Sequence, residues 1–524
     1  MRWIHLLACA LLLACTSAVA GSPLRIGNGP EPESLDPQRM SSVSALNIAR
    51  DLYEGLTRIE ADGKVLPAAA SGWQVADGGR RYTFDLRTDL HWSNGESLAA
   101  ADFVRSLQRA VDPKTGSPFA QLLSPIANAD AITRGDVPAS ILAAWALSPT
   151  RLQILLKQPT PYFLSLLAHP VSFPVYGPAL AQFGRGFARP GRLVSNGAYR
   201  LDDWRVQAQI DLRRNAYYWD DAHTKIDHVQ YLPTDDIASE LKRYRAGELD
   251  VTSEIPLVQA PALRKQFGAQ LHVAPYLGSY YYGFNVQRPP FAGNRNLRLA
   301  LTLAIDRELI VSKVMNGLAQ PAYGWVPPGV AHYQSQLPEW AHWPQAQRVA
   351  EARRLYAASG YTADRPLQIE LRYNTHDDHK RIATVIAAMW KQMLGVETTL
   401  INEENKVFLA QRRMRRVTQV FRASWIGDYD DPSSFLDVLT SDNGRNDMGW
   451  HDARYDGLVA QAAREEDASR RADLLAHAER RALDDVPFIP IYWYVSKHLV
   501  KPRVQGWHDN LLDYHYSKDL RVDE

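Results

Sequence analysis

Hydrophobic and polar residues follow two different periods along this chain, and the two periods alternate. Residues 81–87 alternate apolar and polar side chains, which predicts a half-buried strand. In 101–111 apolar residues recur at every fourth position, and Pro113 ends the predicted helix. The same patterns predict strands over 367–373 and 416–423 and a helix over 381–394 that ends at Gly395. This mixture predicts an α/β (mixed α+β) protein whose sheets are covered by helices.

The N-terminus carries the one apolar stretch that resembles a membrane segment. Residues 6–14 are apolar and follow a short basic start, which is typical of a secretory signal and too short to span a bilayer. Small residues at 18–20 predict a signal peptide over 1–20. The sequence Leu-Leu-Ala-Cys ending at Cys15 also resembles a lipoprotein box, in which Cys15 bears the lipid. Both alternatives place the folded part outside the cytoplasm.

Composition limits the kinds of partner and site. The only cysteines are Cys9 and Cys15, so the mature body has no disulfide and no thiolate site. The 59 basic and 58 acidic residues give a net charge of +1, so the chain has no overall electrostatic attraction for nucleic acid or anionic lipid. The chain is long enough for a large core and too long for a single domain.

A secreted peptide hydrolase is the main alternative from another class of protein. Asp428, Asp430 and Asp431 could act as an acid/base cluster, but neighbours on an extended chain point in different directions. The sequence has no His-Glu-x-x-His, Gly-x-Ser-x-Gly or phosphate-loop motif. His376 and His379 suggest a metal, yet no second ligand set accompanies them and they fit a helix start better. We therefore expect no enzymatic activity, no catalytic residue, no metal and no cofactor.

Short segments in a fixed order carry a family resemblance that runs from about Leu24 to the C-terminus. They include Ser-Leu-Asp-Pro at 34–37, Trp-Ser-Asn-Gly-Glu at 92–96, Asn-Gly-Ala-Tyr at 196–199, Tyr-Tyr-Tyr at 280–282 and the segment 424–429. Together they resemble the peptide-binding members of the family 5 extracellular solute-binding proteins. The resemblance implies a two-lobed periplasmic-binding-protein fold (Venus flytrap, class II or cluster C) with an extra inserted domain.

The same resemblance implies how the chain is divided and what it works with. Domain I is expected to combine 21–54, 178–278 and 492–524, with domain II inserted at 55–177 and domain III at 279–491. The expected function is a monomeric, periplasmic substrate-binding component of an ABC transporter. Its expected partners are short oligopeptides and the membrane permease subunits, and the alternative ligand is a murein tripeptide.

A receptor for peptides of varied sequence must bind the features that all peptides share, which are an ammonium, a carboxylate and a backbone ladder. By resemblance, Asp428 pairs with the α-ammonium. Its alternative role is to cap a turn beside Pro432. The backbones of Ser424 and Ile426 are expected on one side of the peptide, and those of Ser41 to Val43 on the other.

The peptide's carboxylate needs a cation, and the resemblance implies three positions. They correspond to Arg422, to His379 in the segment that begins at Asn374, and to either Arg412 or Arg413. Arginine suits such a site because its planar fork donates two parallel hydrogen bonds. Without the resemblance, the basic run around Arg412 is typical of a solvated face.

Other positions differ from the family pattern or stay open. Tyr281 and Trp425 are expected to be walls of the site, with ordinary core packing as the alternative. The family's disulfide corresponds to Gly278 and Ile426, so both halves are absent together. Acidic or aromatic pocket residues are replaced near Ser41 and at two further positions, Gly283 and Asn405. These replacements predict weaker attraction for lysine-containing peptides.

Overall fold

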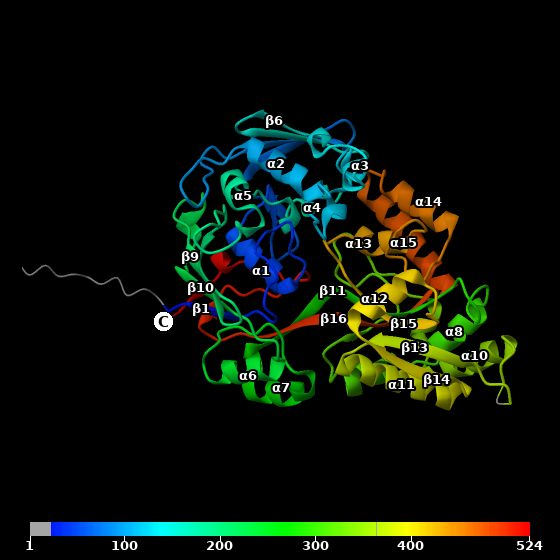
Figure 1. Ribbon diagram of the computed structural model, residues 1–524. Helices are drawn as coiled ribbons and strands as arrows, with labels where there is room; N and C mark the ends of the chain where they lie inside the picture. The colour runs from blue at the N-terminus through cyan, green and yellow to red at the C-terminus, as the bar shows by residue number, and fades with distance from the viewer. Residues whose placement is uncertain (1–21, 363, 524) are drawn as a thin grey trace, which may run out of the picture.

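The computed structural model describes residues 22–362 and 364–523 as two lobes of mixed helix and sheet, seen at the left and right of Figure 1. The predicted leader, with Cys9 and Cys15, lies outside the described residues. None of the helices in the described part is both long and apolar enough to cross a membrane. The mixed fold class expected from the sequence is confirmed.

The first lobe contains a four-stranded sheet in the order β1-β10-β9-β8. Its strands are β1 (Leu24–Gly27), β10 (His228–Leu232), β9 (Gln209–Arg214) and β8 (Tyr199–Arg205). β1 runs parallel to β10, and the other pairs are antiparallel. Helix α1 (Val43–Leu52) begins at the N-cap Ser42, whose hydroxyl accepts the N–H of Ala45. The N-terminal strand β1 is thus paired with β10, which follows it in the sequence by about 200 residues.

A second four-stranded sheet of the first lobe lies above this one in Figure 1. Its order is β4-β5-β7-β6, from β4 (Ala70–Ala76), β5 (Arg81–Leu86), β7 (Arg151–Leu155) and β6 (Ala144–Ser148). Helix α2 (Ala100–Val111) buries Phe103, Leu107 and Val111, which are the apolar positions at helical spacing. The strand predicted over 81–87 and the helix over 101–111 are both confirmed.

The second lobe is built on a six-stranded sheet in the order β12-β16-β11-β15-β13-β14. The strands are β12 (Gln320–Pro321), β16 (Phe488–Leu499), β11 (Leu271–Phe284), β15 (Val420–Ile426), β13 (Gln368–Asn374) and β14 (Glu397–Glu403). β13 runs parallel to β14 and β15, whereas β11 is antiparallel to β15 and β16. Apolar side chains alternate across this sheet, so it has a core on each face.

Helices cover both faces of the six-stranded sheet. One face carries α8 (Arg295–Leu303), α10 (Gln345–Ala358) and α11 (Asp377–Leu394), and the other carries α14 (Ala453–Ala462) and α15 (Ala468–Asp485). Helix α11 begins four residues before the predicted helix. His376 is its N-cap, and Gly395 ends it with φ 76°. The interpretation of this histidine segment as a helix start is confirmed.

The remaining elements connect these layers. They include α3 (Ala129–Thr133), α4 (Phe163–Leu166), α5 (Gly177–Phe183), α6 (Ile237–Arg245), α7 (Ala260–Phe267), α9 (Arg307–Leu309), α12 (Asn405–Met414), α13 (Ser433–Leu436), and the pairs β2 (Thr57–Ile59) with β3 (Val65–Pro67) and β17 (Val504–Gln505) with β18 (Arg521–Val522). The strand predicted over 416–423 starts later, at Val420. Arg415, with φ 54°, ends α12, and a short connection follows before β15.

Two long strands run between the lobes. β11 and β16 pair from Leu271 opposite Leu499 to Gly283 opposite Phe488, with an interruption in register between Pro275 and Ser279. Figure 1 shows both strands at the junction of the lobes. The expected domain boundaries at 278/279 and 491/492 fall inside these strands.

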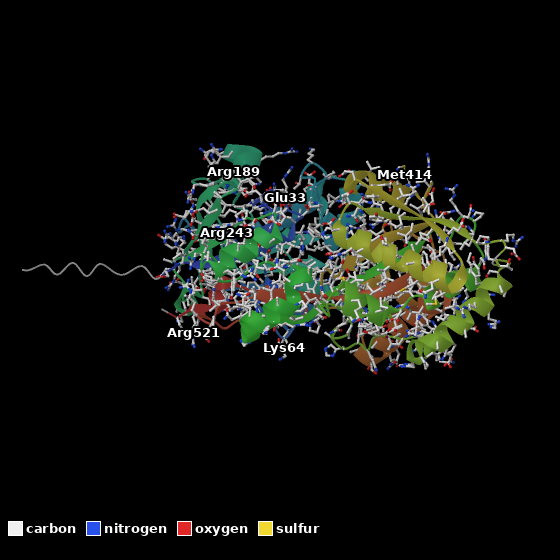
Figure 2. The ribbon with its side chains drawn as sticks, turned by 90° about the horizontal axis from the view of Figure 1, so that it is seen from below. Glu33, Lys64, Arg189, Arg243, Met414 and Arg521 are labelled. Atoms are coloured by element: carbon white, nitrogen blue, oxygen red, sulfur yellow. The ribbon has the colours of Figure 1, made fainter. Side chains whose placement is uncertain are left out.

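Seen from below, the side-chain view separates the two lobes. Arg189, Arg243 and Arg521 lie on the first lobe, and Met414, at the end of α12, lies on the second (Figure 2). Glu33 lies on the side of the first lobe toward the second. The segment around Ser41, which contacts Glu33, is therefore near the junction of the lobes.

Candidate functional site

A cleft of about 630 Å³ is lined by residues of both lobes. The first lobe contributes the start of α1, including Ser42 and Val43, and the second contributes His376, Ser424 and Ile426. The C-terminal part of β16 and the segment that follows it complete the wall. The three expected residues Val43, Ser424 and Ile426, which are far apart in sequence, thus line one cavity.

Strand β15 presents alternate side chains to the two faces of its sheet. Arg422, Ser424 and Ile426 share one face, and their partners on β11 are Tyr282, Tyr280 and Gly278 in that order. Ile426 is 38% exposed, so the end of β15 reaches the cleft with little cover. Such an exposed strand end is the feature that an extended peptide needs for backbone pairing.

Gly278 and Ile426 face each other directly across β11 and β15. A Cβ on Gly278 would lie 2.5 Å from Cδ1 of Ile426, so the isoleucine side chain occupies the space above the glycine. These are the two positions that correspond to the family's disulfide. Side-chain packing therefore takes the place of a covalent link between the same two strands.

Asp428 lies two residues beyond the end of β15. Its backbone N–H donates to Oγ of Ser434 at 2.9 Å, but no hydrogen bond or ion pair reaches its carboxylate from the part of the chain that the structure describes. Burial raises the pKa of Asp428 to about 6, and the charge of Arg445 opposes this rise. An unpaired carboxylate in a poorly solvated position favours a cation as its partner.

The neighbouring aspartates have different partners. Asp431 accepts the N–H of Ser433 at 2.9 Å and forms two hydrogen bonds with Arg471, of 2.8 and 2.7 Å. Asp430 accepts the N–H of Ala331 at 3.0 Å. The turn beside Pro432 is thus capped by Asp431 and not by Asp428. Asp430 and Asp431 face separate partners while the carboxylate of Asp428 has none among the described residues, and this arrangement does not form an acid/base pair.

Arg422 lies on the same strand, six residues before Asp428. Its guanidinium donates to Oδ1 of Asn374 at 3.5 Å and to Oη of Tyr494 at 3.3 Å, and it lies 4.8 Å from the ring centroid of Tyr280. All these partners are neutral, and no carboxylate within the described residues pairs with this cation. Arg422 is not itself in the cleft lining, but it contacts Tyr494, which is. Its charge remains available for an anion.

His379 contacts the same group of residues. Its Nδ1 lies 3.3 Å from Oη of Tyr280. Burial, together with the charges of Arg422 and His376, lowers the pKa of His379 to about 2. The imidazole is therefore neutral at physiological pH, and Arg422 supplies the positive charge at this end of the site.

The two arginines of α12 are placed differently from Arg422. Nε of Arg412 lies 2.6 Å from Oδ2 of Asp447, so its charge is already compensated. Arg413 is exposed on the helix. Arg412 also donates to the carbonyl of Arg422 at 3.4 Å, which places it behind β15 as a support. Neither side chain lines the cleft described above.

Two further expectations need correction. Tyr281 is 3% exposed and packs against Trp325 at 4.7 Å and Phe488 at 6.1 Å, because alternation along β11 turns it into the core. It is a core residue and not a wall. Val43 is 63% exposed in the cleft, but it is the first residue of α1, so its backbone is not extended.

Trp425 in the second lobe and Ser41 in the first each make hydrogen bonds that stabilise the nearby backbone. Nε1 of Trp425 donates to the carbonyl of Ser434 at 2.6 Å, and Oγ of this serine receives the N–H of Asp428. The tryptophan therefore braces the turn that carries the free carboxylate. The N–H of Ser41 donates to the carboxylate of Glu33. This contact holds Glu33 beside the start of α1, and Glu33 is not among the residues that line the cleft.

Sequence reasoning missed the C-terminal wall of the cleft. Tyr494, Lys497, His498, Asp513 and His515 all line the cavity. The signal that could have found part of it is the alternation along β16, where Tyr494, Ser496 and His498 occupy every second position. The rest depends on how the last thirty residues fold back, which no local pattern indicates.

Comparisons with known proteins identify relatives over nearly the whole chain. Residues 64–447 match the family model for bacterial extracellular solute-binding proteins, family 5 Middle. The chain is 40% identical over 499 residues to the periplasmic oligopeptide-binding protein OppA of Escherichia coli (strain K12), covering 94% of this chain and 91% of the relative. It is also 40% identical over 531 residues to the probable deoxycholate-binding periplasmic protein YgiS of the same strain, covering 100% and 98%.

Solved structures show the same fold. The murein tripeptide binding protein MppA of Escherichia coli matches with a TM-score of 0.84 at 36% identity, covering 96% of this chain and 98% of that one. The family match spans most of the chain, and the relatives cover nearly all of it. The chain therefore belongs to the bacterial extracellular solute-binding proteins, family 5.

Proposed function

We propose that this protein captures short peptides with free ends in the cleft between its lobes and delivers them to the permease of an ABC importer. One observation carries the proposal. The carboxylate of Asp428 and the guanidinium of Arg422 lie six residues apart on one strand and its extension, and neither has a counter-ion among the described residues. A zwitterionic peptide supplies both missing partners.

The physical reason is the cost of desolvating a charge. Taking an ammonium or a carboxylate out of water without a partner costs several kcal/mol. A ligand enclosed between two lobes must therefore pair both of its ends. The exposed strand end at Ser424 and Ile426 offers backbone groups to a peptide of any sequence, so affinity does not depend on particular side chains.

Closure of the lobes is the proposed signal to the transporter. The domain boundaries proposed above place the hinge in β11 and β16, and the register break between Pro275 and Ser279 supports that position. A peptide that bridges the first-lobe wall at Val43 and the second-lobe strand shifts the population toward the closed form. In this account the protein acts in the periplasm as a monomeric receptor without catalytic activity.

The relatives suggest two other ligand classes. A murein tripeptide is the second candidate, since the matched structure MppA is a murein tripeptide binding protein and such a peptide also presents charged ends. A bile acid such as deoxycholate has a carboxylate but no ammonium. It would use Arg422 and leave Asp428 unpaired, so the free carboxylate favours peptides.

Native mass spectrometry of the freshly purified protein tests the proposal. We expect a series of co-purifying masses that fragment as short peptides. A single murein mass would favour the second candidate, and a steroid acid would contradict the proposal. Incubation of the purified protein with those peptides should return them intact, whereas cleavage products would indicate a hydrolase.

A further inference from the structure

Three metal-ligating side chains converge in the C-terminal wall of the cleft, on the first lobe. Nε2 of His498 lies 2.9 and 3.0 Å from the two carboxylate oxygens of Asp513, and Nε2 of His515 lies 3.0 Å from Oδ1. The three donor atoms all lie within 4.8 Å of one another. All three residues line the cavity between the lobes.

We propose that His498, Asp513 and His515 form a binding site for a divalent transition-metal ion of the Ni²⁺, Cu²⁺ or Zn²⁺ class. The site lies apart from the charged groups of β15 and does not depend on whether the cleft takes peptides. The sequence did not predict it. Asp513 and His515 are separated from His498 by fifteen residues or more, and the spacing matches no metal motif.

The protein holds both imidazoles in orientations suited to metal binding. Nδ1 of His498 lies 2.8 Å from the carbonyl of Thr252, so Nδ1–H donates there and Nε2 is left to face Asp513. The ring of His515 stacks on Trp507 with centroids 3.6 Å apart. Nε1 of Trp507 in turn donates to Asp509 at 3.1 Å. A ligating histidine anchored through its other nitrogen is the usual arrangement around protein-bound metals.

The separations between donors fit a real coordination sphere. At metal–donor distances of about 2.1 Å, donors at right angles lie about 3.0 Å apart and opposite donors about 4.2 Å apart. The two histidine–aspartate separations, 2.9 and 3.0 Å, match the first value. The widest separation, 4.8 Å at most, needs a movement of about 0.6 Å to match the second. Small side-chain rotations are enough for this.

The donor set and its surroundings select the class of ion. Two imidazoles and one carboxylate suit Zn²⁺, Cu²⁺ and Ni²⁺, whereas Mg²⁺ and Ca²⁺ prefer sites made of oxygen alone. In the empty site His498 and Asp513 form a hydrogen-bonded pair, and a metal ion that binds there displaces the proton on Nε2 of His498, which leaves a ligand set of net charge −1. The nearby cation Lys497 is already paired with Glu254 at 3.6 Å. Three protein ligands leave coordination positions directed to the cleft, where water or a bound ligand completes the sphere.

The other histidine pair of the cleft offers no comparable set. Nδ1 of His376 accepts the N–H of Asp378 at the start of α11, and Nδ1 of His379 contacts Tyr280. Nδ1 of His272 lies 3.1 Å from Oδ1 of Asp509, and its ring lies 6.2 Å from that of Trp507, so this residue contacts the groups that support His515. His376 therefore serves as the matched control, because it is an imidazole that lines the cleft and shares no carboxylate with its neighbour His379.

Equilibrium dialysis with metal analysis tests the proposal. The protein is purified from the periplasm of an expression host through a tag free of histidine. We expect one Zn²⁺ or Ni²⁺ per chain and no binding of Mg²⁺ or Ca²⁺ under the same conditions. Asp513→Asn and His515→Gln should each lower the affinity by more than about tenfold. Asp513 has φ 56°, a conformation that asparagine also tolerates, so Asp513→Asn should remain folded.

His376→Gln should bind the metal within about twofold of the unchanged protein. The proposal is overturned if the unchanged protein binds no better than Asp513→Asn, or if His376→Gln abolishes binding instead. Circular dichroism and the melting temperature of each variant separate loss of the site from loss of the fold. In addition, Co²⁺ loaded into the unchanged protein should give an absorption spectrum that Asp513→Asn lacks.

Discussion

Asp428→Asn should weaken peptide binding and at the same time stabilise the empty protein. An asparagine of the same shape keeps the backbone N–H contact to Ser434 but removes the charge that meets the peptide ammonium. Truncating one member of a buried charge pair costs about 2–5 kcal/mol, which corresponds to an affinity loss of about 30- to 5000-fold. Isothermal titration calorimetry of ligand-free protein with one tripeptide measures this loss.

The predicted gain in stability follows from the pKa of Asp428. The folded pKa is raised from 3.8 to about 6, so ionisation of this group is less favourable in the folded than in the unfolded chain. The protonated carboxyl therefore stabilises the fold most below about pH 4, and the advantage is lost as the pH rises through about 6. Two units correspond to about 3 kcal/mol, reduced to about 1–2 kcal/mol because the side chain is partly exposed.

Urea unfolding at pH 7.5 and at pH 4 measures the stability change. We expect Asp428→Asn to be the more stable protein at pH 7.5 and to equal the unchanged protein at pH 4. Asp430→Asn is the matched control for peptide affinity, because it removes a charge from the same turn while its side chain still accepts the N–H of Ala331. Burial also raises the pKa of Asp430, so this variant should gain stability at pH 7.5 without losing affinity. An unchanged peptide affinity in Asp428→Asn, with equal affinities for free and N-acetylated peptide, would refute the reasoning.

Further predictions concern pH, the other end of the peptide, the strand pair and side-chain preference. Peptide affinity should fall about tenfold between pH 7.5 and pH 5, because protonation of Asp428 removes the partner of the ammonium; calorimetry at both values checks this, and a flat profile would contradict it. Arg422→Gln should lower affinity for free-carboxylate peptides by about 2 kcal/mol or more and leave C-terminally amidated peptides nearly unaffected; an equal loss for both would argue against the assignment. The double variant Gly278→Cys with Ile426→Cys should form a disulfide on oxidation, since the two residues face each other. The disulfide should raise the free energy of unfolding by about 2–4 kcal/mol. Thiol titration and melting curves in oxidant and in reductant measure this, and free thiols after oxidation would contradict the prediction. In competition assays, a tripeptide with a central lysine should bind no more tightly than its alanine counterpart, and a clear lysine preference would be the contrary result.

Sequence patterns predicted those helices and strands whose formation depends on the local spacing of apolar residues. Strand β5 and helix α2 follow from alternation and from apolar spacing ended by Pro113. Strand β15 was predicted to begin four residues too early. The stretch after Arg415 has strand-like composition, but the strand cannot begin there because Arg415 has a positive φ. The side chain of Asn285, which donates to the carbonyl of Arg415, stabilises this turn.

Site residues could be predicted only at positions that match the family pattern. That pattern named Asp428 and Arg422, and geometry then distinguished them from Asp431 and Arg412, which already have partners. Chain composition cannot indicate which of several aspartates or arginines is left unpaired, because pairing depends on distant segments. His498 and His515 meet only after the C-terminal segment folds back onto β16.

A crystal structure of the protein with a bound free-ended peptide tests the central claim most directly. The measured quantity is the distance from the carboxylate oxygens of Asp428 to the N-terminal nitrogen of the peptide. We predict about 2.7–2.9 Å, as for a charge-assisted hydrogen bond shielded from solvent. A carboxylate turned toward bulk water, with the peptide nitrogen held by another group, would contradict the account.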